Sequence, residues 1–289
     1  MKLTAFLCLA MVLLFSCSKE KSFEGETTNN NGSTDSLLVR MVQKAGPDSI
    51  TYSYAYDASR RLISQTYFSS LQGVTNNEQI TVKRSAQGVI QQVIQNGDLF
   101  SVNGINNLVF NVHYDASTSR YTSKVFTFQD AGITVIDSIV YTYNGAGKII
   151  RAEDFYGAPQ YNQFTEGGKT EFTYSGSNIN NAKTFDYDTT TGAYHLSYEQ
   201  TFEYDANVNP LSLGVEAIVL SYPTYFTNND AALFAVDNVT KDTYTDYDNS
   251  ANNDVISFIY MYNTLKKPDL GTGTYKGNRG SYAITYYYQ

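Results

Sequence analysis

Tryptophan is absent from the 289-residue sequence, and cysteine is scarce, with only Cys8 and Cys17 near the N-terminus. Beyond Cys17 the chain has no thiol that could form a disulfide, act as a nucleophile or bind a metal. Proline occurs five times, and charged residues make up only 17% of the sequence. A chain of this length can still bury a sizeable core, so we expect its stability to come from packing.

The charges that are present are mainly acidic, and the formal net charge is −8. An acidic surface does not attract phosphate backbones, so no nucleic acid is expected as a partner. The sequence has no glycine-rich phosphate loop, dinucleotide fingerprint or basic stripe, and no cofactor is expected. Tyrosine and phenylalanine are abundant instead, with 26 and 16 copies. Together with valine, isoleucine and threonine they favour strands over helices.

Residues 1–16 have the features of a signal peptide. Lys2 gives a positive start, and the apolar stretch over 3–15 is too short to span a bilayer well. The stretch ends in Leu14-Phe15-Ser16-Cys17, which resembles the lipobox of bacterial lipoproteins, although Phe15 stands where a small or β-branched residue is usual. The resemblance implies that Cys17 is lipidated after the leader is removed. The alternative is an ordinary signal peptide with a chance cysteine.

Residues 17–36 are predicted to form a flexible tether, because they are rich in Thr, Asn, Gly and Ser and have no apolar period. Ser18-Lys19-Glu20 resembles the short charged tags of some Bacteroidota surface lipoproteins. Residues 37–289 would then form one repetitive β domain. We expect an outer-membrane lipoprotein on the periplasmic or cell-surface face.

One sequence unit recurs in this domain: an alternating aromatic strand, an Asp, Asn or Ser, a few small or polar residues, and an apolar residue that starts the next strand. The residue before each turn recurs in steps of about 30, at positions 56, 84, 114, 143, 174 and 204, and again at 262. One unit is therefore missing or replaced between residues 207 and 257. Such a period is typical of a fold built from one repeated supersecondary unit.

Each unit is predicted to be a β-hairpin. Alternation places Tyr52, Tyr54 and Tyr56 on one face of a strand, and Asp, Asn, Ser and Gly favour the turns. Hairpins at this spacing form an antiparallel meander whose neighbouring rings become cross-strand pairs. We therefore predict an all-β fold, an antiparallel meander of about seven hairpin repeats in one large curved or barrel-like sheet, with at most one short helix.

The stretch over 210–241 interrupts this pattern. We expect it to cover an edge of the sheet, because the terminal strands of an open meander expose unpaired backbone groups. Within this stretch, Asn229 and Asp230 could cap a short helix over 231–236.

The units that begin at Tyr54 and Tyr141 resemble the YD repeats of RHS-type proteins, with Arg60 in place of glycine and Asn144 in place of aspartate. The second half is similar to Bacteroidota lipoproteins of unknown function that are built from YD-like hairpins. That similarity rests on the order of short segments, namely Asp205, Asn209-Pro210-Leu211, Asp237-Asn238-Val239, Tyr260-Met261-Tyr262 and Pro268. It implies a fold and an envelope location, and it implies no catalytic residue.

Residues that could carry chemistry are few. His113 and His195 lie in alternating strand-like sequence, and no Gly-x-Ser-x-Gly elbow accompanies them, so we expect both to occupy ordinary strand positions. The segment from Asp246 to Asp254 partly follows a calcium loop but lacks its central glycine, and Ser257 replaces the closing glutamate. Asp186-Tyr187-Asp188 is a similar partial match. Solvated turns are the simpler interpretation, and no metal site or catalytic residue is predicted.

The sequence thus favours a non-catalytic binding or structural module of the envelope. It would be attached to the membrane through its N-terminal lipid, with a glycan or an envelope protein as partner and a ligand site that remains unknown. The alternative is a secreted polysaccharide-degrading hydrolase. Such an enzyme needs two carboxylates about 5–10 Å apart in a cleft, and the sequence singles out no such pair.

Overall fold

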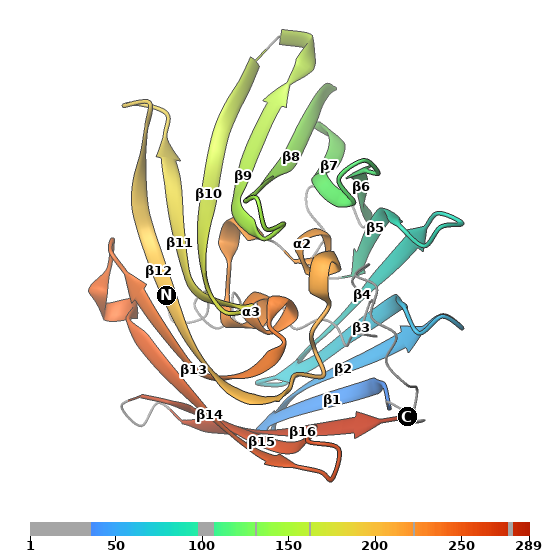
Figure 1. Cartoon of the computed structure of the whole chain (residues 1–289). Helices are drawn as coiled ribbons and strands as arrows, with labels where there is room; N and C mark the ends of the chain where they lie inside the picture. Colours follow the sequence, from blue (N-terminus) through green and yellow to red (C-terminus); the bar gives the residue numbers. More distant parts are fainter. Residues whose placement is uncertain (1–35, 98–106, 131, 162, 222, 277–279) are drawn as a thin grey trace.

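The chain folds into a closed antiparallel β-barrel of sixteen strands, in which sequential strands are neighbours (Figure 1). The computed structural model describes residues 36–97, 107–130, 132–161, 163–221, 223–276 and 280–289. The predicted all-β antiparallel meander is confirmed. The leader, Cys17 and most of the predicted tether lie outside the described residues.

The strands have similar lengths, and most are joined by short turns. They are β1 (Leu38–Ala45), β2 (Asp48–Tyr56), β3 (Leu62–Leu71), β4 (Val74–Arg84), β5 (Ile90–Gly97), β6 (Asn107–Asp115), β7 (Arg120–Asp130), β8 (Ile133–Tyr143), β9 (Ile149–Ala158), β10 (Gln163–Ser175), β11 (Asn178–Asp188), β12 (Ala193–Val208), β13 (Asp237–Asp246), β14 (Asp254–Tyr262), β15 (Pro268–Tyr275) and β16 (Ser281–Tyr288).

The barrel closes because the first strand pairs with the last. Met41 on β1 lies opposite Tyr286 on β16, and the backbones of Leu37 and Gln289 exchange two hydrogen bonds of 2.9 Å. Closure leaves no open edge between these terminal strands. The prediction that residues 210–241 cover a sheet edge is therefore wrong.

The predicted YD-like turns have one shared geometry. Asp57, Asn144 and Asn263 each accept, through the side-chain oxygen, the backbone N–H four residues later, at 2.9 to 3.1 Å. The residue before that donor adopts a positive φ, which is 80° at Gly147 and 65° at Arg60. Glycine adopts this conformation without steric cost. The arginine at position 60 therefore occupies a backbone position that the usual glycine fits better.

The residue before each turn ties one hairpin to the preceding one. The hydroxyl of Tyr56 donates to the carbonyl of Leu38, and Tyr143 donates in the same way to the carbonyl of Tyr121. Tyr204, which also precedes a turn, donates to Ile179, and Tyr260 and Tyr288 at other positions donate to Val239 and Pro268. At positions 56, 143 and 204 the repeat therefore uses the hydroxyl that distinguishes tyrosine from phenylalanine.

Alternate side chains of the strands face the lumen and form the core. Tyr52 and Tyr54 are almost completely buried, and the Tyr52 ring meets that of Tyr67 edge-on at 5.4 Å. The core also contains residues that lie inside the barrel, such as Phe226, whose ring is 4.9 Å from that of Phe172. The predicted buried face of aromatic rings is confirmed, and it is the inner face of a barrel.

The missing repeat unit is replaced by a segment that enters the lumen. Residues 209–236, which we call the plug, contain the short elements η3 (Gly214–Glu216), α2 (Ala217–Leu220), η4 (Pro223–Tyr225) and α3 (Asn228–Phe234). The short helix predicted over 231–236 corresponds to α3, but it begins three residues earlier. Its N-cap is Thr227, which forms a capping box with Asp230. Two further short elements lie at turns, η2 (Pro159–Tyr161) and η5 (Ser250–Asn252).

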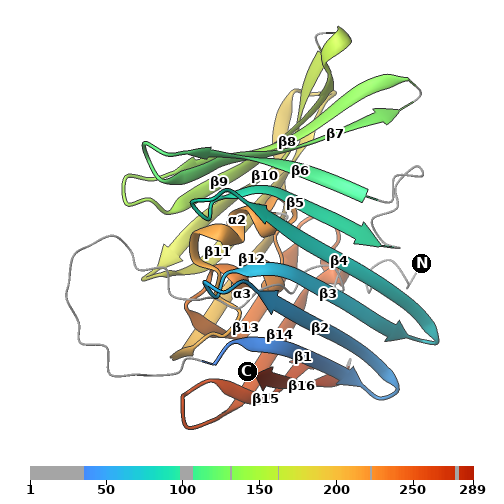
Figure 2. The ribbon, with the colours of Figure 1, turned by 90° about the vertical axis from the view of Figure 1, so that its right-hand side faces the viewer.

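The two ends of the barrel differ. Figure 2 shows the helices of the plug in the half of the barrel that holds the β2–β3 and β4–β5 turns. The chain also enters β1 and leaves β16 at this end. We call it the plug end, and we call the end with the β1–β2 and β3–β4 turns the far end.

Candidate functional site

The plug is held at its start by one buried asparagine. The side-chain amide of Asn209 donates to the carbonyls of Ala232 and Ala235, and its oxygen accepts the N–H of Leu211 at 2.9 Å. Asn209 therefore joins the two ends of the plug. The apolar side chains of α2 between them are buried in the barrel core.

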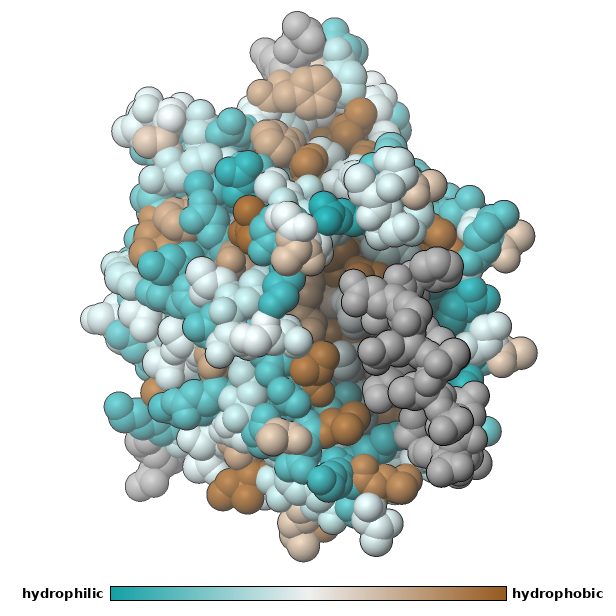
Figure 3. Space-filling model, in the orientation of Figure 1, coloured by the Kyte–Doolittle hydropathy of each residue, from teal (hydrophilic) through white to brown (hydrophobic). Residues whose placement is uncertain are grey.

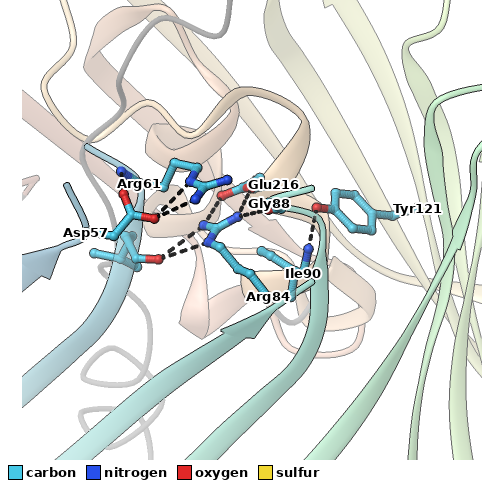
Figure 4. A network of polar contacts seen from close by, with 8 residues as sticks. Asp57, Arg61, Arg84, Gly88, Ile90, Tyr121 and Glu216 are labelled. Atoms are coloured by element: carbon cyan, nitrogen blue, oxygen red, sulfur yellow. Dashed lines mark hydrogen bonds and ion pairs between the residues drawn. The ribbon is translucent and has the colours of Figure 1, made fainter. Parts of the chain in front are cut away.

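A buried ion pair fixes the plug to the barrel wall. Arg84 on β4 forms a bidentate pair with Glu216, in which the Nη2–Oε2 distance is 2.7 Å. The same guanidinium donates to the carbonyls of Gly88 and Leu62 (Figure 4). Burial alone would lower the pKa of Arg84, but its bonds to Glu216 raise that pKa above the ordinary value. Paired and bonded in this way, the two charges lock the position of the plug.

A second group of charges lies where the plug meets strands β7 to β9. Its members, which we call the lumenal cluster, are Lys124, Asp137, Asp154 and Asp230. The Lys124 side chain is almost completely buried, and its amine donates to the carbonyl of Ser221 at 2.5 Å. Desolvation by burial lowers the pKa of Lys124 to about 8, although the three carboxylates act to raise it.

One carboxyl group of this cluster, Asp154, has a strongly shifted pKa. Burial, followed by the charge and the hydrogen bond of Asp137, raises the pKa of Asp154 well above its ordinary value. Two carboxyl groups that share a hydrogen bond are closer than the roughly 5–10 Å that a glycosidase requires. The pair therefore does not have the geometry of the hydrolase alternative.

Two consecutive glycines make room for this cluster. Gly167 and Gly168 form a bulge in β10, where the pairing with β9 steps from Glu166 to Lys169. A side chain at position 167 would meet Asp154 Oδ2 at 2.9 Å. At position 168 it would meet the backbone oxygen of Phe185 at 3.3 Å. The absence of a side chain at Gly167 thus leaves room for the Asp154 carboxylate, and its absence at Gly168 lets the Phe185 backbone approach closely.

Several buried hydroxyls near the plug have no hydrogen-bond partner among the described residues. Ser221 Oγ and Thr224 Oγ1 belong to the plug, and Tyr54 has its hydroxyl on the lumen side of β2. Buried polar groups are normally satisfied by protein, water or a ligand. Water molecules inside the barrel could satisfy these three hydroxyls.

A second buried carboxylate lies deeper along the wall. Asp242 on β13 is 3% exposed and accepts from the amide of Gln200 at 3.2 Å. Burial raises the pKa of Asp242 to about 7, because the bond to Gln200 offsets only part of the desolvation and Asp254 adds to it. The lumen thus holds carboxyl groups that are easily protonated.

The residues considered from sequence lie elsewhere. His113 and His195 are exposed positions on β6 and β12, as expected. The carboxylate of Asp246 accepts from the backbone of Asp248 and Asn249 and from the Asn252 amide, so it stabilises its own turn. Cys17 lies outside the described residues.

One group of possible cation ligands is nevertheless brought together. Asp186, His195 and Asp248 have ligand atoms within 4.8 Å of one another. Two of the three are exposed at the rim of the far end. Exposed carboxylates commonly occur together without a metal, so this group alone assigns no site.

Sequence reasoning missed the charged residues that hold the plug. Arg84 occupies the position where other repeats have the bonding tyrosine, and it donates to Leu62 as those tyrosines donate to their carbonyls. Lys124 shares its strand face with Phe126, which packs against the core. The available signal was a charged residue at a position where the repeat has an inward aromatic one. The plug residues that accept from Arg84 and Lys124 could not be predicted, because the plug has no repeat.

No protein-family model and no curated protein matches the chain. Among solved structures, it is similar to a porin-like protein from Bacteroides uniformis, at 12% identity and a TM-score of 0.53, covering 87% of this chain and 98% of that one. A porin-like protein from Bacteroides vulgatus is similar at 14% identity and a TM-score of 0.52, covering 88% and 99%. At this identity the likeness shows the shared fold. Within the described residues, no helix is long and apolar enough to cross a bilayer.

Proposed function

We propose that the protein is a non-catalytic binding module of the bacterial envelope. In this proposal it is a plugged barrel that stands in water and is tethered to the outer membrane through lipid on Cys17. The observation that carries it is the polarity of the two barrel faces. The face toward the lumen is mainly apolar and aromatic, apart from the buried charged and polar groups described above, and the outer face is mainly polar.

Strand β4 illustrates this polarity. Its buried, inward residues are Ile80, Val82 and one acid, Glu78, whereas the alternate residues Asn77, Gln79 and Lys83 are exposed. A membrane-spanning barrel has the reverse pattern, with an apolar band about 25 Å tall facing lipid. The similar Bacteroides structures are described as porin-like. We infer that this chain has their architecture without a lipid-spanning exterior.

Polar contacts between outward side chains support the same conclusion. Lys241 on β13 pairs with Glu203 on β12 at 2.6 Å, and Tyr247 donates to Glu199 at 2.8 Å. Such exposed contacts contribute little to stability, but charged groups on a lipid-facing surface would be destabilising.

The plug argues against free passage through the lumen. Glu216 and Asn209 hold the plug by ionic and amide contacts, and its apolar residues belong to the barrel core. A lumen filled in this way resembles a folded core rather than a channel. Binding is therefore expected between the plug and the far end, where Phe126, Tyr198 and Tyr244 are only partly buried.

The proposal of a lipid anchor is based on the sequence. The lipobox-like segment ending at Cys17 and the polar stretch that follows predict a lipidated N-terminus on a tether of about 20 residues. The YD-like turns described above support membership of the envelope lipoproteins built from such hairpins. A surface-exposed or periplasmic barrel on a tether could capture a glycan, because tyrosine rings stack on sugar rings.

Metabolic labelling with a palmitate analogue tests the anchor. The wild-type chain should incorporate label and fractionate with membranes, and Cys17→Ala should lose the label. Cys8→Ala is the matched control and should be labelled like wild type, because Cys8 lies inside the leader. Label that persists in Cys17→Ala would show that the lipid is not on this residue.

A glycan array tests the binding role. The probe is the chain from residue 17, with Cys17→Ser to prevent lipidation. We expect retention on at least one glycan and weaker retention for Tyr156→Ala, since Tyr156 is an exposed ring on the same strand face as Asp154. Tyr287→Ala, on the outer face, is the control. Failure to retain any glycan would discard the glycan version of the proposal.

A further inference from the structure

We propose that the plug end of the barrel rests on the phospholipid surface through an apolar patch on the outer face of β14–β16. The patch consists of Ile259, Met261, Leu265, Leu270 and Tyr287. The inference rests on the proposed anchor at Cys17 and adds an orientation to it. The membrane would face the plug end, and the far end would face away.

The patch is strongly exposed and continuous. Ile259 is 75% exposed and Met261 is 64% exposed, although both lie within a regular strand. Met261 pairs with Leu270 on β15, and Leu270 pairs with Thr285 on β16, two residues before Tyr287. Paired residues share one face of a sheet, so these side chains form one surface. Figure 3 shows apolar side chains along the lower edge of a mostly hydrophilic surface, near β14–β16 of Figure 1.

The patch is placed beside the point where the tether joins the barrel. Lys267, in the turn after β14, donates to the carbonyl of Ser36 at 2.7 Å. Ser36 precedes β1 and is thereby held next to Leu265 in the same turn. The tether expected from the sequence, about 20 residues between Cys17 and this point, would have a typical reach near 25 Å. A lipid on Cys17 would therefore keep the patch close to the bilayer surface.

The polar groups around the patch suit a lipid surface. The Arg40 guanidinium lies 3.9 Å from the centre of the Tyr287 ring, and Lys266 is exposed in the turn. Tyrosine and long basic side chains are favoured at membrane–water interfaces. Asp269, the acid beside the patch, accepts from the Asn263 amide.

The size of the patch favours lipid over a second copy of the chain. Stable protein interfaces use about 20–30 residues a side, far more than the five residues of the patch. A shallow apolar patch gives weak membrane affinity on its own. It becomes effective beside a covalent lipid, because stable anchoring combines two such signals.

The test uses the full lipidated protein in vesicles of phosphatidylethanolamine and phosphatidylglycerol that contain a spin-labelled lipid. A polarity-sensitive fluorophore is attached at Met261→Cys or, as the matched control, at Val74→Cys. Val74 is 61% exposed but begins β4 at the far end. We expect the Met261 probe to shift to shorter wavelength and to be quenched by the spin label. The Val74 probe should keep its emission in water.

Equal emission and equal quenching at the two positions would overturn the inference. Shielding of the Met261 probe that rises with protein concentration, without quenching by lipid, would also overturn it in favour of contact between copies. Palmitate incorporation distinguishes a failure of the proposed orientation from a failure of the proposed lipid anchor. Incorporation without quenching refutes only the orientation, whereas absence of incorporation at Cys17 refutes the anchor and the inference together. As a second variant, Leu270→Gln should reduce the quenching at position 261, and Val74→Gln should not.

Discussion

Arg84 on β4 and Glu216 on the plug form a bidentate ion pair between residues 132 positions apart in the sequence. Their side chains are 6% and 11% exposed, so each charge depends on the other for solvation. The pair lies where the repeat pattern is broken twice, by an arginine at a tyrosine position and by a plug in place of a hairpin turn.

Glu216→Ala is predicted to lower the free energy of unfolding by about 3 kcal/mol, because it leaves the Arg84 charge buried and unpaired. Urea unfolding followed by circular dichroism measures the change. The matched control is Glu203→Ala, which removes an exposed partner of Lys241 and should cost less than about 1 kcal/mol. Equal costs for the two variants would contradict a locked plug.

Asn209→Ala is predicted to destabilise the protein by about 2 kcal/mol, since two hydrogen bonds that join the ends of the plug and a third to Leu211 are lost in a buried site. Hydrogen exchange should show the larger change in the plug amides. Asn180→Ala removes a single exposed contact with Thr173 and serves as the control. Protection of the plug that is unaffected by Asn209→Ala would argue against its role.

Arg60→Gly is predicted to stabilise the protein by about 1 kcal/mol, because Arg60 holds a positive φ of 65° in an exposed turn. The reverse change, Gly147→Arg, places a side chain on the equivalent position of another repeat, where φ is 80°, and should destabilise by a similar amount. Thermal unfolding measures both. A loss of stability in Arg60→Gly would show that the arginine side chain contributes more than the strain costs.

The stability of the protein should decline as the pH rises from about 4 through 7, because of Asp242. The pKa of this carboxyl is about 7 in the folded protein against 3.8 for the ordinary group. The folded protein therefore binds the Asp242 proton more tightly than the unfolded chain does. The stabilisation that this proton provides is complete below the unfolded pKa and is lost as the pH rises through the folded pKa. Asp242→Asn should flatten the curve in this window. An unchanged slope would contradict the assignment.

Much of the architecture follows from local chemistry that the sequence displays. The alternation of Tyr52, Tyr54 and Tyr56 and the turn residues Asp57 and Asn144 specify hairpins, since each acts within a few residues. Closure between β1 and β16 was harder to predict from the sequence, because it depends on strand number and stagger rather than on any single residue. An open curved sheet and a closed barrel have the same local pattern.

The lumenal site was beyond sequence reasoning for a related reason. Lys124, Asp137 and Asp154 lie on separate strands, and Asp230 comes from the plug. Pairing of the consecutive strands β7, β8 and β9 brings the first three residues near one another, and the plug adds Asp230, so no short spacing in the sequence marks the cluster. The role of Gly167 could not be predicted either, because the carboxylate for which it makes room is contributed by a neighbouring strand.

The proposal that the barrel stands in water, with its aromatic face inward around the plug, is tested most directly by sedimentation velocity without detergent. The chain from residue 17 with Cys17→Ser should sediment as a compact, β-rich species whose behaviour does not change when detergent is added. A chain that aggregates in buffer and becomes monodisperse only in detergent micelles would show that the outer face belongs in lipid, and would contradict the account.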